Sequence, residues 1–182
     1  MIIRKAAPAD MMAIFNVRTK SWRSSYTGIL PSKYLASLDS QDSLKEWKAD
    51  LDAVNHHLVT FIAEDDQHNI VGYAMAGPEK DGDPIFGSEL YAIYLLDPYQ
   101  HRGVGTQLVQ AVAAELIQQG YQAMLVWALS ANPTRAFYEK MGGVLVDQKE
   151  ILLGGSNYTE VAYGWRDIRL LAGFVPAAQP GD

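Results

Sequence analysis

The stretch DPYQHRGVGTQLVQAV, residues 97–112, carries the pattern that decides the fold. It follows an aliphatic and aromatic run, residues 88–96, that is typical of a buried β-strand. Gly103 and Gly105 flank Val104, and the apolar spacing of a helix begins immediately afterwards. Bare backbone amides at the start of a helix are typical of an anion-binding site. We therefore expect a strand, a glycine turn that holds an anion, and a helix over residues 104–119.

Three interpretations of this turn are open at the level of its residues. The glycines can simply relieve steric strain between a strand and a helix. A dinucleotide-binding turn needs a third glycine, where the chain has Leu108, and an acidic residue after the next strand, where it has the apolar LVWAL. A triphosphate loop is not one of the three, because it needs a Lys-Ser/Thr pair after the glycines, which is missing here. The third interpretation is the pyrophosphate of coenzyme A.

Two motifs favour the third interpretation. The first is QHRGVG, residues 100–105, and the second is SANPTRAFYEKMGG, residues 130–143, which follows the next expected strand. The first resembles the acyl-CoA signature of the GNAT superfamily of N-acetyltransferases, which lies between that family's fourth strand and third helix. The second is similar to the family's N-x-x-A-x-x-F-Y-x-K-x-G-F segment. It departs from that pattern at Gly143, which stands where the family usually has an aromatic residue.

The resemblance implies that acetyl-CoA is the cosubstrate. It places the amides of residues 102–106 around the pyrophosphate, as the physics of helix N-termini also favours. It also places a backbone amide near Leu95 against the oxyanion of the reaction. The residues expected to bind the cofactor are Tyr94, Leu95, Leu96, Gln100, Arg102, Gly103, Val104, Gly105, Thr106, Asn132, Arg135 and Tyr138.

Acetyl transfer to an amine requires that the ammonium lose a proton, that the oxyanion meet donors, and that the leaving thiolate be protonated. The chain has no cysteine, so direct attack by the amine is expected. Glu89 is the candidate base, because its spacing from Gln100 matches the catalytic glutamate of the histone-acetyltransferase branch; its alternative is a solvated carboxylate at a strand end. Tyr138 is the candidate acid, and its alternative is a core aromatic. Tyr91 and Tyr94 can instead position a water chain.

The acceptor pocket is expected along SWRSSYTGILP, residues 21–31. By resemblance, Trp22, Arg23 and Tyr26 line it together with Tyr91, although helical spacing also fits Trp22 and Tyr26 as core residues. This segment and TEVAYGW, residues 159–165, resemble bacterial GNAT sequences of unassigned substrate. The acceptor stays open among a small amine, a polyamine, an antibiotic and a peptide amine. A non-catalytic acyl-CoA-binding module is the alternative to an enzyme.

The order of expected elements indicates an α/β fold in a single domain. Expected strands cover residues 2–6, 57–65, 70–77, 88–96, 122–129, 144–153 and 158–165; expected helices cover residues 8–26, 31–51, 104–119 and 133–141. The resemblance implies a mixed, mostly antiparallel sheet of about seven strands that is flanked by helices and splayed between the fourth and fifth strands. The expected GNAT domain is residues 1–168, with a C-terminal tail at 169–182.

The composition limits which binding partners and which cellular location are expected. The chain has 182 residues and a net charge of −6, which argues against a nucleic-acid binder. Without an apolar run of about 20 residues or a signal peptide, we expect no membrane partner and a cytoplasmic location. We expect no metal, because no cysteine is present and the adjacent His56 and His57 would point to opposite faces of a strand. A homodimer stays open.

Overall fold

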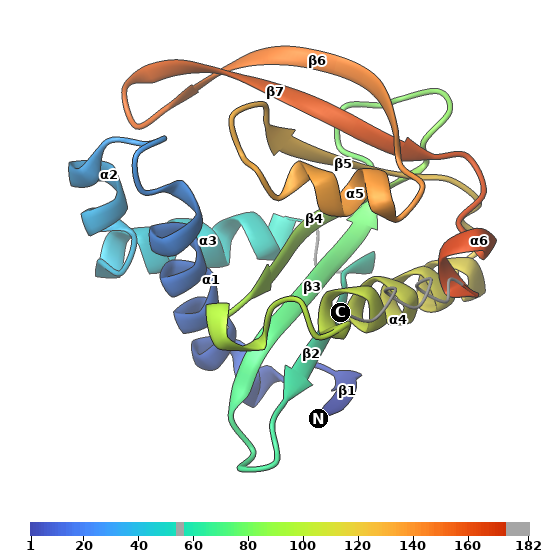
Figure 1. The fold of residues 1–182 in the computed structure, drawn as a ribbon, viewed down its shortest axis with the longest axis horizontal. Coiled ribbons are helices and arrows are strands. Elements are labelled where there is room, and N and C mark those ends of the chain that lie inside the picture. The colour runs from blue at the N-terminus through green and yellow to red at the C-terminus, as the bar shows by residue number, and fades with distance from the viewer. Residues whose placement is uncertain (54–56, 174–182) are drawn as a thin grey trace, which may run out of the picture.

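The computed structural model describes residues 1–53 and 57–173, so His56 lies outside the described residues. Its strands form one seven-stranded sheet in the order β1-β2-β3-β4-β5-β7-β6, in which only the β4–β5 pair is parallel. This confirms the predicted fold class (Figure 1). The elements are β1 (Ile2–Lys5), η1 (Pro8–Asp10), α1 (Met11–Tyr26), α2 (Ser32–Ser37), α3 (Gln41–Ala53), β2 (Val59–Glu64), β3 (Ile70–Pro78), β4 (Ser88–Leu95), η3 (Asp97–Tyr99), α4 (Val104–Gln118), β5 (Met124–Leu129), α5 (Arg135–Lys140), β6 (Val144–Leu153), β7 (Ser156–Trp165) and α6 (Arg169–Ala172).

The sheet opens between β4 and β5. These two strands pair only where Ser88 meets Met124 and Glu89 meets Leu125, and they diverge after that point (Figure 1). Parallel neighbours need a crossover connection, and α4 supplies it. The remainder of β4 therefore pairs with β3 on one edge and has no β5 partner on the other. The expected splay lies at this point.

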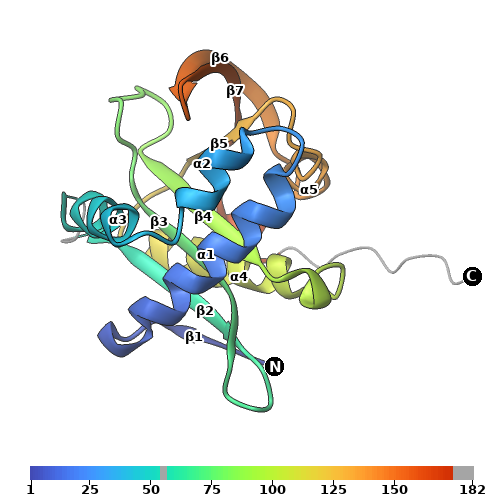
Figure 2. The same cartoon turned by 90° about the vertical axis from the view of Figure 1, so that its left-hand side faces the viewer.

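Helices cover both faces of the sheet. Figure 2 shows α1 in front of the central strands and α4 behind them. The apolar stripe of α4, which consists of Leu108, Val112 and Leu116, is completely buried against the sheet, as its three-to-four-residue spacing requires. Burial of each such side chain stabilises the fold by about 1.5–3 kcal/mol. On α1, Phe15 and Tyr26 are buried, whereas Met12 is exposed.

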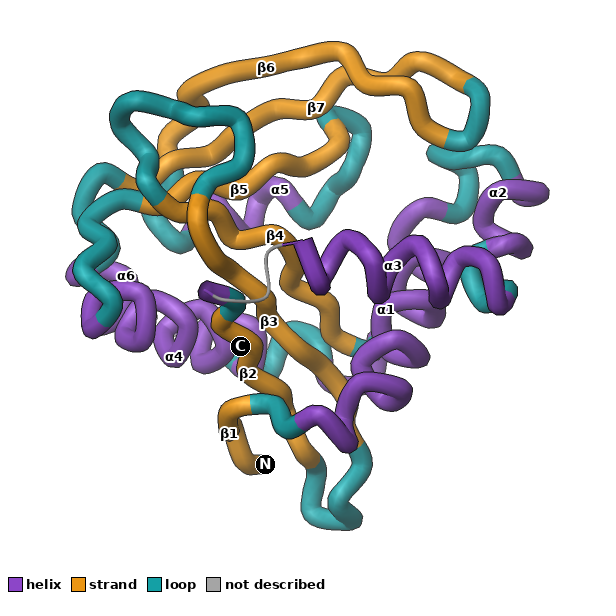
Figure 3. Tube along the Cα trace, turned by 180° about the vertical axis from the view of Figure 1, so that it is seen from behind, coloured by secondary structure: helices purple, strands orange, loops and turns teal. Residues whose placement is uncertain are grey.

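The β6–β7 hairpin forms the far edge of the sheet and arches over the opening (Figure 3). Its turn is Gly154-Gly155, and both glycines have positive φ angles of 58° and 83°. An L side chain is strained in this region, so the glycines fix the turn. β7 begins at Ser156, two residues before the predicted start. At the turn, Gly154 packs against the ring of Tyr34 from α2, so the hairpin reaches the α1–α2 corner.

The packed part of the chain extends beyond residue 168, where the sequence placed the start of the tail. α6 contacts α4, and both Ile168 and Leu171 are buried in the main core. Among the described residues, no helix is long and apolar enough to cross a bilayer.

Candidate active site

The glycine turn presents unpaired amides at the start of α4. Gly103 is the residue that precedes the helix, and its φ angle of 78° lies in the left-handed region. The first turn closes where the Gln107 amide donates to the Gly103 carbonyl at 3.1 Å. The helix therefore offers no acceptor to the amides of Val104, Gly105 and Thr106. Those amides and the helix dipole make this end of α4 suitable for an anion.

Gly103 and Gly105 lack a side chain for different structural reasons. Gly103 needs its left-handed conformation, and an added Cβ there would meet open space. Gly105 is helical, and an added Cβ would meet Phe137 at 3.5 Å and Ile93 at 3.9 Å, which are ordinary contacts. The missing side chain of Gly105 therefore faces the opening of the sheet, and its amide faces the end of the helix.

The free edge of β4 supplies a further donor. The Leu96 amide donates to the Val71 carbonyl of β3 at 2.9 Å. Because successive residues of a strand turn their polar groups to opposite edges, the amide of Leu95 faces the opening. The side-chain amide of Gln100 donates to the Leu95 carbonyl at 2.9 Å and to Asp97 at 3.2 Å. Gln100 thus supports the end of β4 and does not itself reach into the turn.

The other predicted cofactor residues differ in accessibility. Arg102 is exposed and Val104 is buried in the core, so Val104 can offer only its backbone amide. Thr106 contacts the sulfur of Met141 at 3.7 Å, and one terminal nitrogen of Arg135 donates to the Tyr163 hydroxyl at 3.5 Å. Leu96 packs between the clusters on the two faces of the sheet. Arg102 is therefore the predicted cation that is most available to an anion at the turn.

The second motif forms α5 and the loop before it. Asn132 is buried, and its side-chain oxygen accepts hydrogen bonds from the Thr134 amide at 2.9 Å and the Thr134 hydroxyl at 2.8 Å. Tyr138 is also buried, with its ring centroid 5.9 Å from that of Tyr163. Burial raises the pKa of Tyr138. Its hydroxyl therefore stays protonated and can act as a hydrogen-bond donor.

Gly143, where this chain departs from the family pattern, has a steric explanation. A Cβ at this position would lie 2.8 Å from the ring of Trp165 and 2.9 Å from the Tyr138 carbonyl. The indole nitrogen of Trp165 donates to the Met141 carbonyl at 3.0 Å, which fixes that ring. Trp165 from β7 therefore occupies the space that an aromatic side chain at position 143 would need.

Three tyrosine hydroxyls gather where α1, β4 and α5 meet. Burial raises the pKa of Tyr26, whereas hydrogen bonds from the side chains of Asn132 and Tyr94 lower it. Burial also raises the pKa of Tyr94, and the charges that Tyr26 and Tyr138 would carry on ionisation raise it further. These couplings place the hydroxyls of Tyr26, Tyr94 and Tyr138 near one another. The sequence assigned them separately to the acceptor, the cofactor and the acid.

A β-bulge in β4 brings the side chains of Glu89, Tyr91 and Tyr94 to one face of the sheet. Leu90 pairs with Ala76 and Ala92 pairs with Met75, so Tyr91 is an extra residue. Because a slip of one residue exchanges the two faces of a strand, the bulge puts Tyr94 on the same face as Glu89 and Tyr91. Without the bulge, Tyr94 would point to the α4 side.

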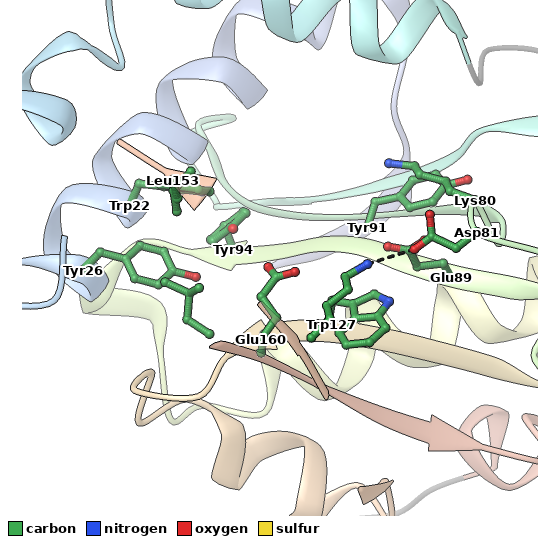
Figure 4. A pocket seen from close by; sticks show the side chains of 13 residues that line it. Trp22, Tyr26, Lys80, Asp81, Glu89, Tyr91, Tyr94, Trp127, Leu153 and Glu160 are labelled. Carbon is green, nitrogen blue, oxygen red and sulfur yellow. Dashed lines mark hydrogen bonds and ion pairs between the residues drawn. The ribbon is translucent and has the colours of Figure 1, made fainter. Parts of the chain in front are cut away.

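That face of β4 borders a cavity of about 260 Å³ (Figure 4). The other walls come from α1, the β3–β4 loop, β5 and the hairpin. The lining residues are Trp22, Tyr26, Lys80, Asp81, Glu89, Tyr91, Tyr94, Trp127, Ala128, Leu129, Lys149, Leu153 and Glu160. Trp22, Tyr26 and Tyr91, which were predicted for the acceptor pocket, all line this cavity. Tyr94, predicted for the cofactor, also lines the cavity.

Arg23 does not line this cavity, contrary to the prediction. Its Nε donates to the Leu35 carbonyl at 3.1 Å, and one terminal nitrogen donates to the Ala36 carbonyl at 3.2 Å. The same nitrogen pairs with Asp39 at 2.9 Å. Arginine is suited to the last carbonyls of a helix, and here Arg23 holds the end of α2 against α1.

Glu89 lies where β4 and β5 part. It is 9 % exposed and makes no hydrogen bond or ion pair within the described part of the chain. Burial raises the pKa of Glu89 from 4.5 to about 7, and the charge of Lys80 opposes that rise. A carboxyl group with a pKa near neutrality in a cavity is a functional-site candidate.

The other charged groups in the cavity were not among the predicted site residues. Lys149 of β6 pairs with Asp81 at 2.8 Å and lies 4.1 Å from the centre of the Trp127 ring. Lys80 lies 4.0 Å from the centre of the Tyr91 ring. Glu160 comes from β7, within the TEVAYGW segment. Only the alternation along that strand could have predicted that one of its polar residues faces inward.

The similarity to known proteins agrees with this architecture. Residues 16–143 match the model of the Acetyltransferase (GNAT) family. The chain is also 34 % identical over 170 residues to the uncharacterized N-acetyltransferase YuaI of Bacillus subtilis (strain 168). This alignment covers 93 % of this chain and 95 % of YuaI. This chain belongs to the GNAT acetyltransferase family. The predicted family and enzyme class are thereby confirmed.

Solved structures show the same fold. The PaiA N-acetyltransferase of Thermoplasma acidophilum, solved with coenzyme A, has a TM-score of 0.67 at 21 % identity and covers 88 % of this chain and 96 % of its own. The ribosomal-protein-alanine N-acetyltransferase of Brucella melitensis has a TM-score of 0.68 at 18 % identity. The match covers 91 % of this chain and 99 % of the Brucella chain. At these identities the similarity extends to the fold and leaves the acceptor of this GNAT protein open.

Proposed function

We propose that this GNAT protein transfers an acetyl group from acetyl-CoA to a primary amine by direct attack within a ternary complex. The observation that carries the proposal is the opening between β4 and β5. On one side of it lie the unpaired amides of α4, and on the other lies the cavity that contains Glu89. Two substrates can therefore meet through the sheet.

The α4 side of the opening suits the pyrophosphate and arm of coenzyme A. The amides of Val104, Gly105 and Thr106 point out of the helix, and Arg102 adds an exposed positive charge. The Leu95 amide on the free edge of β4 is a donor for the amide-containing arm or for the oxyanion. Acetyl-CoA would supply the acetyl thioester. A crystallised relative in this fold contains coenzyme A.

Glu89 is the proposed base for the acceptor amine. An alkyl ammonium has an ordinary pKa of about 10.4, so a carboxylate with an ordinary pKa is a weak acceptor for its proton. The raised pKa of Glu89, about 7, narrows this gap. Above pH 7 the group is mostly ionised and ready to accept a proton. Activity is therefore expected to rise with pH through about 7.

Tyr138 is the proposed donor to the leaving thiolate. Its raised pKa makes full proton transfer from the hydroxyl unfavourable, but a hydrogen bond from that hydroxyl stabilises a developing negative charge.

A buried carboxyl group that has no hydrogen-bond or ion-pair partner contributes little to the stability of a fold. The presence of Glu89 without a partner in the described residues thus favours an enzyme over a passive CoA-binding module.

The proposal is tested first by ligand binding. We expect acetyl-CoA at about 100 times its Kd to add about 2.7 kcal/mol to the free energy of unfolding. For a chain of this size that corresponds to a rise in Tm of about 5–10 °C. NAD at the same concentration is the control and should leave Tm unchanged. Thiol release over a panel of primary amines then identifies acceptors. A Tm that does not respond to millimolar acetyl-CoA or CoA would contradict the proposal.

A further inference from the structure

A second carboxyl group enters the cavity from the end opposite Glu89. Glu160 of β7 pairs with Leu129 of β5, whereas Glu89 pairs with Leu125. These two levels are four residues apart along β5, or roughly 13 Å. Figure 4 shows the Glu160 side chain pointing toward Tyr94 and Tyr26, with Glu89 beside Asp81. The cavity therefore has Glu160 at one end and Glu89 with Asp81 at the other.

Among the residues that the structure describes, Glu160 makes no ion pair, although Lys149 is the residue opposite it in the β6–β7 register. It is half-buried, and its carboxyl group makes no hydrogen bond or ion pair with any described residue. The charged groups that face it are Lys149 from β6 and Asp81 from the β3–β4 loop. Lys149 is engaged elsewhere, because it pairs with Asp81 at 2.8 Å and covers the Trp127 ring. An unpaired carboxylate between aromatic walls is costly unless a cation joins it.

The surroundings of the two carboxyl groups differ. Lys149 and Asp81 influence both carboxyl groups, and Lys80 and Glu79 influence Glu89 as well. Only Glu160 of the two acts on Tyr26 of α1, and Tyr26 is also the neighbour of Tyr138, the proposed donor to the thiolate. Glu160 therefore belongs to the same end of the cavity as the three tyrosine hydroxyls.

We propose that Glu160 binds the ammonium group of the acceptor and holds it beside the hydroxyls of Tyr26 and Tyr94, from where its proton would reach Glu89 through water positioned by Tyr91 and Tyr94. The assignment rests on the proposed function, because it names how the acceptor is held at the same site. The chemical class that fits is a protonated primary alkylamine. Its apolar part would lie against Trp22 and Trp127, which are walls of the cavity.

Binding can be measured without turnover. Benzylamine is a suitable probe, because as an alkylamine it is protonated at pH 7.5, and it is added without acetyl-CoA. Two of the four tryptophans, Trp22 and Trp127, line the cavity, so tryptophan fluorescence can report the Kd. We expect Glu160→Gln to weaken benzylammonium binding by tenfold or more, equivalent to at least about 1.4 kcal/mol. Glu160→Asp keeps the charge and should recover part of the affinity.

The matched control is Glu150→Gln. Glu150 lies on the same hairpin, is exposed, and accepts a hydrogen bond from Thr159 outside the cavity. This variant makes the same change in charge and should leave the Kd unchanged. Urea unfolding of each variant shows whether the fold is retained. A Glu160→Gln variant that is folded and binds benzylammonium as the wild type does would overturn the proposal, as would a wild-type chain that does not bind it.

Turnover separates binding from proton transfer. With an accepted amine, Glu160→Gln should raise KM about tenfold and leave kcat within about twofold, whereas Glu89→Gln should lower kcat. A fall in kcat with an unchanged benzylammonium Kd would refute the binding role of Glu160. If acetyl-CoA does not stabilise the chain but Glu160→Gln still weakens benzylammonium binding, the proposed function fails and the cation site stands.

Discussion

Replacement of Glu89 by glutamine should slow the reaction and also stabilise the fold at neutral pH. The pKa of Glu89 rises from 4.5 to about 7 because the folded chain buries the carboxyl group. Between these two values the folded state binds more protons than the unfolded state. The free energy of unfolding therefore falls as pH increases from about 4.5 to 7. Glu89→Gln removes this dependence.

The size of the effect follows from the same pKa. The rise corresponds to about 3.4 kcal/mol, at 1.36 kcal/mol for each pKa unit. This value is an upper estimate, because a water-filled cavity screens the charge and glutamine leaves a polar group in place. We expect the difference in unfolding free energy, variant minus wild type, to become more favourable to the variant by about 1–3 kcal/mol between pH 4.5 and pH 8.

Urea unfolding at a series of pH values measures this difference, and Glu150→Gln is the control at an exposed position. The pH profile of kcat provides the second test. Wild type should lose activity below about pH 7, where Glu89 becomes protonated. The variant should be slower and should lack that limb. Parallel unfolding curves for variant and wild type across the whole pH range would refute the raised pKa, and an unaltered kcat profile would refute the role as base.

Two more substitutions test the second motif. Tyr138→Phe keeps the ring and removes the hydroxyl, so acetyl-CoA should still raise Tm while kcat falls at least about tenfold; wild-type thiol release in this variant would return Tyr138 to a packing role. Gly143→Ala would place a Cβ 2.8 Å from the fixed Trp165 ring, and overpacking of this kind costs about 1–3 kcal/mol. Urea unfolding measures that loss. The matched control is Gly87→Ala, where an added Cβ meets only Tyr121 at 3.6 Å. Gly82→Ala is unsuitable as a control because Gly82 has a positive φ angle.

The strand, the glycine turn and the start of α4 could be predicted from sequence because they are local. A strand, two glycines and a helical repeat within residues 88–119 suffice to place bare amides at a helix start. The same locality explains the successful prediction of the α5 segment before Gly142. The sequence did not predict that the side-chain amide of Gln100 donates to the Leu95 carbonyl. The residue type at a position in a turn does not determine which way its side chain points.

The rest of the cavity lining could not be predicted, for two physical reasons. The bulge at Tyr91 reverses the alternation of β4, and nothing in the residues of that strand marks where it occurs. The second reason is distance along the chain, since α1, the β3–β4 loop and the hairpin meet only in the folded sheet. Arg23 shows the consequence. Its position beside Trp22 suggested the pocket, but one helical residue later the side chain already points at α2.

The opening between β4 and β5 connects these two regions and explains their different origins. After Glu89 the two strands leave each other's backbone groups unpaired, which a closed sheet would avoid. The sheet nevertheless continues on the far side, because β5 pairs along its whole length with β7 and β7 with β6. The unpaired edge of β4 is thus held open by structure on both sides, and its amides remain available to a ligand. Under the proposed function the cofactor would meet that edge, the start of α4 and Tyr138 of α5, so two short motifs can specify its binding. The acceptor would meet whatever α1 and the hairpin place over the opening, and in this chain that includes Glu160. Acceptor choice should therefore follow substitutions in the hairpin and α1 more closely than substitutions in the glycine turn.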